Sequence, residues 1–189
     1  MPTDFMPPTT DELLTAVQRL GMIVRCIHQK RALTDIEKKP QLNFWLLIYG
    51  MLLDVAVLEW CKLFGTDSEP THWKRVVADP DRFRSDLLMA LAIDELRWME
   101  YWQDMKNYRD RHVAHHNWDL SIIDHYPELT LALKSSYFYY SYVIAELRTR
   151  GETRFPADLD EYCARFAHQA GEIGRAALAA TARFRERVY

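Results

Sequence analysis

The densest group of side chains able to do chemistry lies between Asn107 and Asn117, in the stretch NYRDRHVAHHN. Arginine presents a planar fork that matches two phosphate oxygens, and histidine exchanges a proton near neutral pH. Residues 97–116 carry four basic and three acidic side chains, a formal charge of +1 in a chain whose net charge is −3. The stretch is therefore a small cationic island suited to binding an anion.

Arg109 and His115 have a spacing that can bring both side chains to one phosphate. Six residues separate them by about 120° around an ideal helix and by roughly 9 Å along it, which a guanidinium side chain can bridge. One histidine cannot readily act as both base and acid in a single in-line displacement. Two copies related by a two-fold axis could share these tasks, so the spacing favours a symmetric homodimer.

The pattern Arg109-Asp110-x4-His115 resembles the Arg-(Asn/Asp/His)-x4-His motif of the HEPN superfamily. The surrounding YRDRHVAHHN, the upstream NFWLLIYGMLLDVAVLEWCKLFG and the segment around Trp73 are similar to the abortive-infection, AbiU-type branch of that superfamily. The resemblance covers roughly residues 10–150, and the position of the motif near a helix end strengthens it.

The resemblance implies a dimeric helical bundle that pairs two motifs in a cleft and cleaves RNA without a metal or another cofactor. Such enzymes serve toxin–antitoxin, phage-defence or RNA-processing systems, so RNA and a cognate antitoxin protein are the expected partners. Arg109 would hold the phosphate, His115 would transfer protons, and Asp110 would orient the pair or Arg109 alone. Further substrate contacts are expected from three neighbouring side chains: Arg111, His112 and His116.

Two other functions remain open. Some HEPN proteins are noncatalytic RNA-binding or protein-interaction modules, and Arg109 and His115 also fit a solvated helix end. His112 and His116 are four residues apart, a spacing that can chelate a metal from one helix face, and a metal-binding bundle would add His115. No HExxH glutamate or third ligand is fixed by spacing, so we expect no metal site.

The elements that must position this stretch are predicted to be helices. With only 6 glycines and 8 prolines, the chain has little material for hairpin turns. We predict an irregular arm over residues 1–8 and one all-α domain over 9–189, a bundle of about five to six helices. The expected helical segments span residues 9–39, 41–64, 73–78, 80–91, 94–115, 127–150 and 158 to near the C-terminus. The segment over 73–78 is short, and a break near Ile93 divides the run over 80–115.

Local signals mark the starts of three of these helices. Thr9 and Glu12 form a capping box, Asp79 is an N-cap followed by Pro80, and Asp158 with Glu161 opens the last helix. The first helix also carries an apolar stripe at helical spacing: Leu13, Val17, Leu20, Val24 and Ile27.

The helix over residues 41–64 is apolar on nearly every side, which predicts a central position in the bundle, with Gly65 ending it at the C′ position. Asp54 lies on its apolar stripe and needs a cation such as Arg109 or a hydrogen-bond donor. The aromatic run from Tyr137 to Tyr142 is interpreted as core or dimer interface. The basic residues between Arg165 and Arg187 are interpreted as a solvated face.

Cellular location follows from the cysteines and the N-terminus. Three scattered cysteines fit reduced thiols in a cytosol, and the first residues show no signal peptide. The uninterrupted apolar run from Phe44 to Leu53 is too short to span a bilayer. We therefore expect a cytoplasmic protein with no membrane partner.

Overall fold

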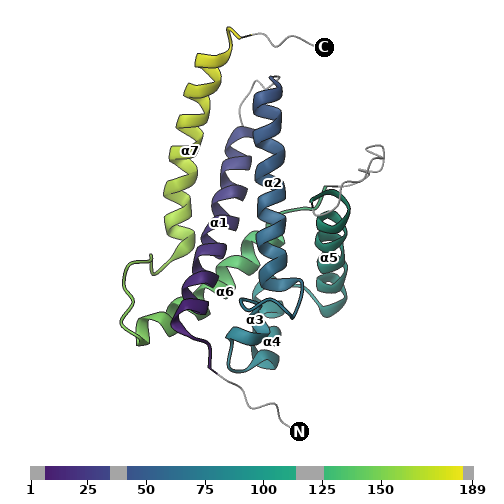
Figure 1. The fold of residues 1–189 in the computed structure, drawn as a ribbon, viewed down its shortest axis with the longest axis vertical. Coiled ribbons are helices and arrows are strands. Elements are labelled where there is room, and N and C mark those ends of the chain that lie inside the picture. The colour runs from purple at the N-terminus through teal and green to yellow at the C-terminus, as the bar shows by residue number, and fades with distance from the viewer. Residues whose placement is uncertain (1–6, 35–41, 114–125, 185–189) are drawn as a thin grey trace.

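The computed structural model describes residues 7–34, 42–113 and 126–184. Within these ranges the chain forms helices and no strand, so the predicted all-α class is confirmed (Figure 1). The α-helices are α1 (Thr10–Thr34), α2 (Asn43–Phe64), α3 (Trp73–Val76), α4 (Pro80–Leu91), α5 (Glu95–Tyr108), α6 (Thr130–Thr149) and α7 (Leu159–Thr181). A π-helical turn, η1 (Arg109–Val113), continues α5.

Helix α1 occupies the centre of the bundle and packs against α2, α6 and α7 (Figure 1). A capping box starts it, as predicted: Glu12 N donates to Thr9 Oγ1 at 3.2 Å, and Thr9 N donates to Glu12 Oε2 at 2.7 Å. The predicted apolar stripe is also confirmed, because all five of its members are buried: Leu13, Val17, Leu20, Val24 and Ile27. The predicted end of this helix near Lys39 lies outside the described residues.

Helix α2 is less central than its apolar composition predicts. Its C-terminal part is buried around Trp60, whereas four large apolar side chains of its N-terminal part are exposed: Phe44, Leu46, Leu47 and Met51. Among the described residues, α2 is the one helix long and apolar enough to cross a membrane by length and composition, with 28% of its most apolar window buried. Core helices pass the same test, so no membrane assignment follows from it.

Gly65 ends α2, but not through the left-handed conformation that a C′ glycine usually adopts. Its φ is −89°, a value open to any residue. A Cβ at this position would instead lie 2.6 Å from the carbonyl oxygen of Cys61, with which the Gly65 N–H already forms a hydrogen bond. The glycine is required by this close backbone approach.

Three short connections turn the chain from α2 to α5. The Asp79 carboxylate caps α4 by accepting from Arg82 N, with Pro80 in the first turn, as the sequence predicted. Ala92 then adopts a left-handed conformation with a φ of 54°, which separates α4 from α5 and confirms the break expected near Ile93. Asp94 caps the new helix by accepting from Arg97 N.

Helix α6 crosses the bundle and contributes tyrosines to its aromatic core. It begins at Thr130, later than the predicted Pro127. Tyr139 and Tyr140 are buried, as expected for core, and their hydroxyls donate to the carbonyl oxygens of Thr71 and Pro156. These two hydrogen bonds tie α6 to the loops that precede α3 and α7.

Helix α7 closes the far side of α1, with Cys163 and Gly171 among its buried residues. The carboxylate of Asp158 caps its first turn, as predicted. Near its other end Thr181 Oγ1 accepts a 3.0 Å hydrogen bond from Trp45 Nε1 of α2. The α1, α2 and α7 axes consequently run side by side (Figure 1).

Candidate phosphate site at the end of helix α5

Helix α5 is fixed in the bundle and positions the Arg109-Asp110 stretch that follows it. Its buried residues recur at the helical spacing of one face: Trp98, Tyr101, Met105 and Tyr108. The Tyr101 hydroxyl makes two hydrogen bonds to the backbone: it donates to Glu128 O at 2.8 Å and accepts from Ala132 N at 3.0 Å. The start of α6 therefore holds α5 in place through backbone atoms.

The motif itself begins on the π-helical turn η1, none of whose residues is buried. The Arg109 N–H is shared between the carbonyl oxygens of Met105 and Lys106 where α5 gives way to the wider turn. Single π turns inside or at the ends of helices are frequent at functional sites, since they redirect side chains away from the helix face. Here the residues of the turn, from Arg109 to Val113, do not continue the buried face of α5.

The Arg109 guanidinium is held by two neighbours and is 21% exposed. Its Nε and Nη2 atoms both lie 2.7 Å from Asp110 Oδ1. Its Nη1 atom lies 3.5 Å from Thr66 Oγ1, in the loop after α2. Asp110, which is 50% exposed, thus forms an ion pair with Arg109, and the role predicted for it in the site stays a prediction.

The buried thiol of Cys61 lies close to this guanidinium. Burial raises the pKa of its thiol to about 12, although nearby Arg109 acts in the opposite direction. Burial likewise raises the pKa of Cys26, and that of Cys163 to about 11. All three cysteines are free and buried, and burial in apolar surroundings lowers the reactivity of a thiol.

Tyr108 connects the site to α2. Its hydroxyl donates to Asp54 Oδ1 at 2.8 Å, so Asp54 has the donor that its position required, and this donor is a tyrosine. Burial, followed by the bond to Asp54, raises the pKa of the Tyr108 hydroxyl well above its usual range. Tyr108 is the last residue of α5 and directly precedes Arg109, so this bond holds the chain in place where η1 begins.

The remaining predicted site residues fall into two groups. His112 is half-buried, and its ring lies 5.2 Å from the Tyr108 ring, while Arg111 is exposed to solvent. His115 and His116 lie outside the described residues, so the predicted approach of His115 to Arg109 stays a prediction. Over the described part of the chain, no three metal-ligating side chains of His, Cys, Asp or Glu lie together.

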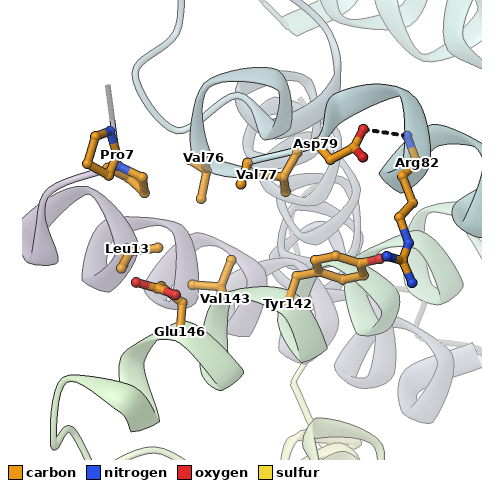
Figure 2. A pocket seen from close by; sticks show the side chains of 11 residues that line it. Pro7, Leu13, Val76, Val77, Asp79, Arg82, Tyr142, Val143 and Glu146 are labelled. Carbon is orange, nitrogen blue, oxygen red and sulfur yellow. Dashed lines mark hydrogen bonds between the residues drawn. The ribbon is translucent and has the colours of Figure 1, made fainter. Parts of the chain in front are cut away.

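A pocket of about 460 Å³ lies elsewhere, between the start of α1, the α3–α4 connection and α6 (Figure 2). Its apolar lining includes Leu13, Val77 and Val143, and Asp79 and Glu146 add carboxylates. None of its lining residues belongs to α5 or η1. This pocket is therefore separate from the Arg109 site.

Sequence reasoning missed two contributors to the site. Thr66 has no motif signal, because it meets Arg109 only through the fold. Tyr126 lies outside the predicted motif, yet its ring is 6.1 Å from that of Tyr108. The apolar spacing along α5 does point to Tyr108, as the last member of the buried stripe.

Comparison with known proteins adds no relative. No protein-family model, curated protein or solved structure matches the chain.

Proposed function

We propose that this protein is a metal-independent endoribonuclease of the HEPN type, acting in a toxin–antitoxin or phage-defence system. The observation that carries the proposal is the Arg109 guanidinium, held on an exposed π turn between Asp110 and Thr66. A positioned arginine at a solvent-open helix end is suited to a phosphodiester. Location in the cytoplasm and a cognate antitoxin belong to the same proposal.

The reaction requires no external reactant. The ribose 2′-oxygen forms a bond to the adjacent phosphorus, the bond from phosphorus to the 5′-oxygen breaks, and a cyclic phosphate and a 5′-hydroxyl result. One histidine accepts the 2′-OH proton and a second protonates the leaving 5′-oxygen. In the proposal His115 of each chain takes one of these roles, and Arg109 stabilises the charge that builds on the phosphoryl oxygens.

The exposed apolar part of α2 supports a dimer at this site. Phe44, Leu47 and Met51 follow one another at helical spacing, and the next position of the same stripe is Asp54. Phe44 is 59% and Leu47 is 65% exposed, and such patches mark protein interfaces. Because Asp54 binds Tyr108, a second copy seated on this stripe would lie beside both motifs.

A noncatalytic RNA-binding or interaction module is the second candidate. The Arg109–Asp110 pair favours the interaction form of this candidate, because a carboxylate that already occupies two guanidinium N–H donors opposes a phosphate. The apolar stripe on α2 suits this candidate equally, since a protein partner can cover it. Cleavage itself therefore decides between the two candidates.

The test is an RNA-cleavage assay with and without excess EDTA, comparing wild type with His115→Ala. His168→Ala is a matched control, because His168 on α7 is exposed and pairs with Glu172 on the same helix. We expect cleavage that EDTA leaves unchanged, a loss of about 10²- to 10⁴-fold in His115→Ala, and none in His168→Ala. A folded wild-type dimer that cleaves no RNA would favour the second candidate.

The pH dependence checks the acid–base scheme separately. If one histidine is neutral while its symmetry mate is charged, the rate peaks near the ordinary histidine pKa of about 6.5. A flat profile from about pH 5 to 9 contradicts this scheme, whatever the outcome of the mutagenesis.

A further inference from the structure

Three aromatic rings form a cluster beside Arg109 that the proposed chemistry does not use. The Tyr108 ring contacts the His112 ring at 5.2 Å between centroids and the Tyr126 ring at 6.1 Å. The interplanar angles are 47° and 52°, so the rings are tilted and not stacked face to face. We call these three side chains the Tyr108 cluster.

The cluster is anchored at one end and open at the other. Tyr108 is only 7% exposed, and its hydroxyl is fixed by Asp54, so its ring has a defined orientation. Tyr126 is 59% exposed although it is a large aromatic side chain. An exposed ring supported by a buried, hydrogen-bonded ring offers a rigid π surface to a ligand, with little entropy left to lose on binding.

Two cationic residues alternate along the chain with members of the cluster. Arg109 follows Tyr108 directly, and Arg111, which is exposed, directly precedes His112. The opposing charges are Asp110, which is paired with Arg109, and Asp54, which is bonded to Tyr108. Aromatic surfaces beside cations are the arrangement by which proteins hold single-stranded nucleic acid, with bases stacked on rings and phosphates on cations.

We propose that the Tyr108 cluster is a base-stacking subsite, in which the exposed Tyr126 ring holds an unpaired base next to the phosphate bound by Arg109. This inference rests on the proposed function for the identity of the phosphate ligand, and it specifies the substrate as single-stranded RNA. Bases in a duplex are already stacked and are not free to lie on the ring. The subsite therefore selects loops and single strands over duplexes.

Binding of a non-cleavable strand tests the subsite apart from cleavage. The probe is a fluorescein-labelled 12-nucleotide RNA that is fully 2′-O-methylated, so that no 2′-hydroxyl can attack, and binding is followed by fluorescence anisotropy. We expect Tyr126→Ala to weaken binding about tenfold, and Tyr126→Phe, which retains the ring, to stay within about twofold of wild type. The same strand annealed to its complement should bind wild type more weakly.

Salt dependence separates stacking from charge. Tyr126→Ala should leave the slope of log K against log salt unchanged, whereas Arg109→Ala should reduce it by about one phosphate contact. Equal affinity of wild type and Tyr126→Ala overturns the subsite, as does an equal loss in Tyr126→Phe and Tyr126→Ala. A wild type that binds no single strand, or that prefers the duplex, overturns it too.

Cleavage of the unmodified strand, measured alongside, keeps the two proposals apart. A wild type that binds through Tyr126 but cleaves nothing refutes the nuclease and leaves the subsite standing. A wild type whose cleavage and binding are both indifferent to Tyr126→Ala refutes the subsite and leaves the nuclease standing.

Discussion

Gly65→Ala is expected to destabilise the protein by a steric mechanism at the end of α2. The added Cβ would lie 2.6 Å from Cys61 O and 3.1 Å from Cys61 Cα, both of them backbone atoms that cannot rotate away. Overpacking of this kind costs about 2 kcal/mol. For a chain of this length that corresponds to a melting temperature lower by roughly 4–8 °C.

Gly50→Ala is the matched control, since it makes the same chemical change in the same helix. Nothing lies within 4 Å of a Cβ at Gly50. Alanine inside a helix is favoured over glycine by about 0.5–1 kcal/mol, so this variant should be at least as stable as wild type. The two substitutions are therefore predicted to change the free energy of unfolding in opposite directions.

Urea denaturation followed by circular dichroism at 222 nm measures both variants. If Gly65→Ala were as stable as Gly50→Ala, the close approach to Cys61 would not be the reason for the glycine. Because Thr66 follows Gly65 and lies 3.5 Å from Arg109 Nη1, the strained variant should also bind the methylated RNA more weakly. Unchanged RNA binding in a destabilised Gly65→Ala would show that the loop does not position Arg109.

Three further substitutions test other contacts. Burial lowers the pKa of His72 from its ordinary 6.5 to about 4, so the folded state disfavours its protonation and stability is lost as pH falls from 6.5 toward 4. His72→Asn, which retains an acceptor for Lys74 N, should flatten that part of the stability–pH curve. An unchanged curve would contradict His72 as the source of the stability loss. Tyr108→Phe should cost about 1–2 kcal/mol in urea denaturation by leaving Asp54 without its donor, and no loss would exclude a structural role for that bond. Asp110→Asn should tighten binding of the methylated RNA and slow cleavage. If binding and cleavage both strengthened or both weakened, an orienting role for Asp110 would be refuted.

The local signals in the sequence predicted the helix starts well. The caps at Thr9, Asp79 and Asp158 form as expected, because a capping side chain and the N–H groups that it satisfies are within three residues of each other. The break near Ile93 was predicted, but its left-handed residue is Ala92, which carries no glycine-like signal. Cap chemistry is local and is readable from one chain.

The environment of α2 could not be predicted from periodicity. A helix that is apolar on all sides has the same pattern whether the core or a partner covers its outer face. The exposed Leu47 and the buried Trp60 therefore look equivalent in the sequence, and only the packing of α1 and α5 distinguishes them. The hydrogen-bond partner of Asp54 could not be predicted for the same reason, because Tyr108 reaches Asp54 only through the packing of α5 against α2.

The π turn explains why the motif spacing alone could not define the site. On an ideal α-helix Arg109 and His115 are separated by about 120°, but a turn that opens at Arg109 changes every angle after it. In the described chain Arg109 pairs with the adjacent Asp110, so an incoming phosphate must compete with that carboxylate for the Nε and Nη2 donors. Additional positive charge shifts this competition toward the phosphate, but the motif of a second copy would carry the same Arg109–Asp110 pair and add no net charge through it. The Arg109–Asp110 pair thus predicts that phosphate binding depends on cations outside the pair, and Arg111, which is exposed on the same turn, is one of them.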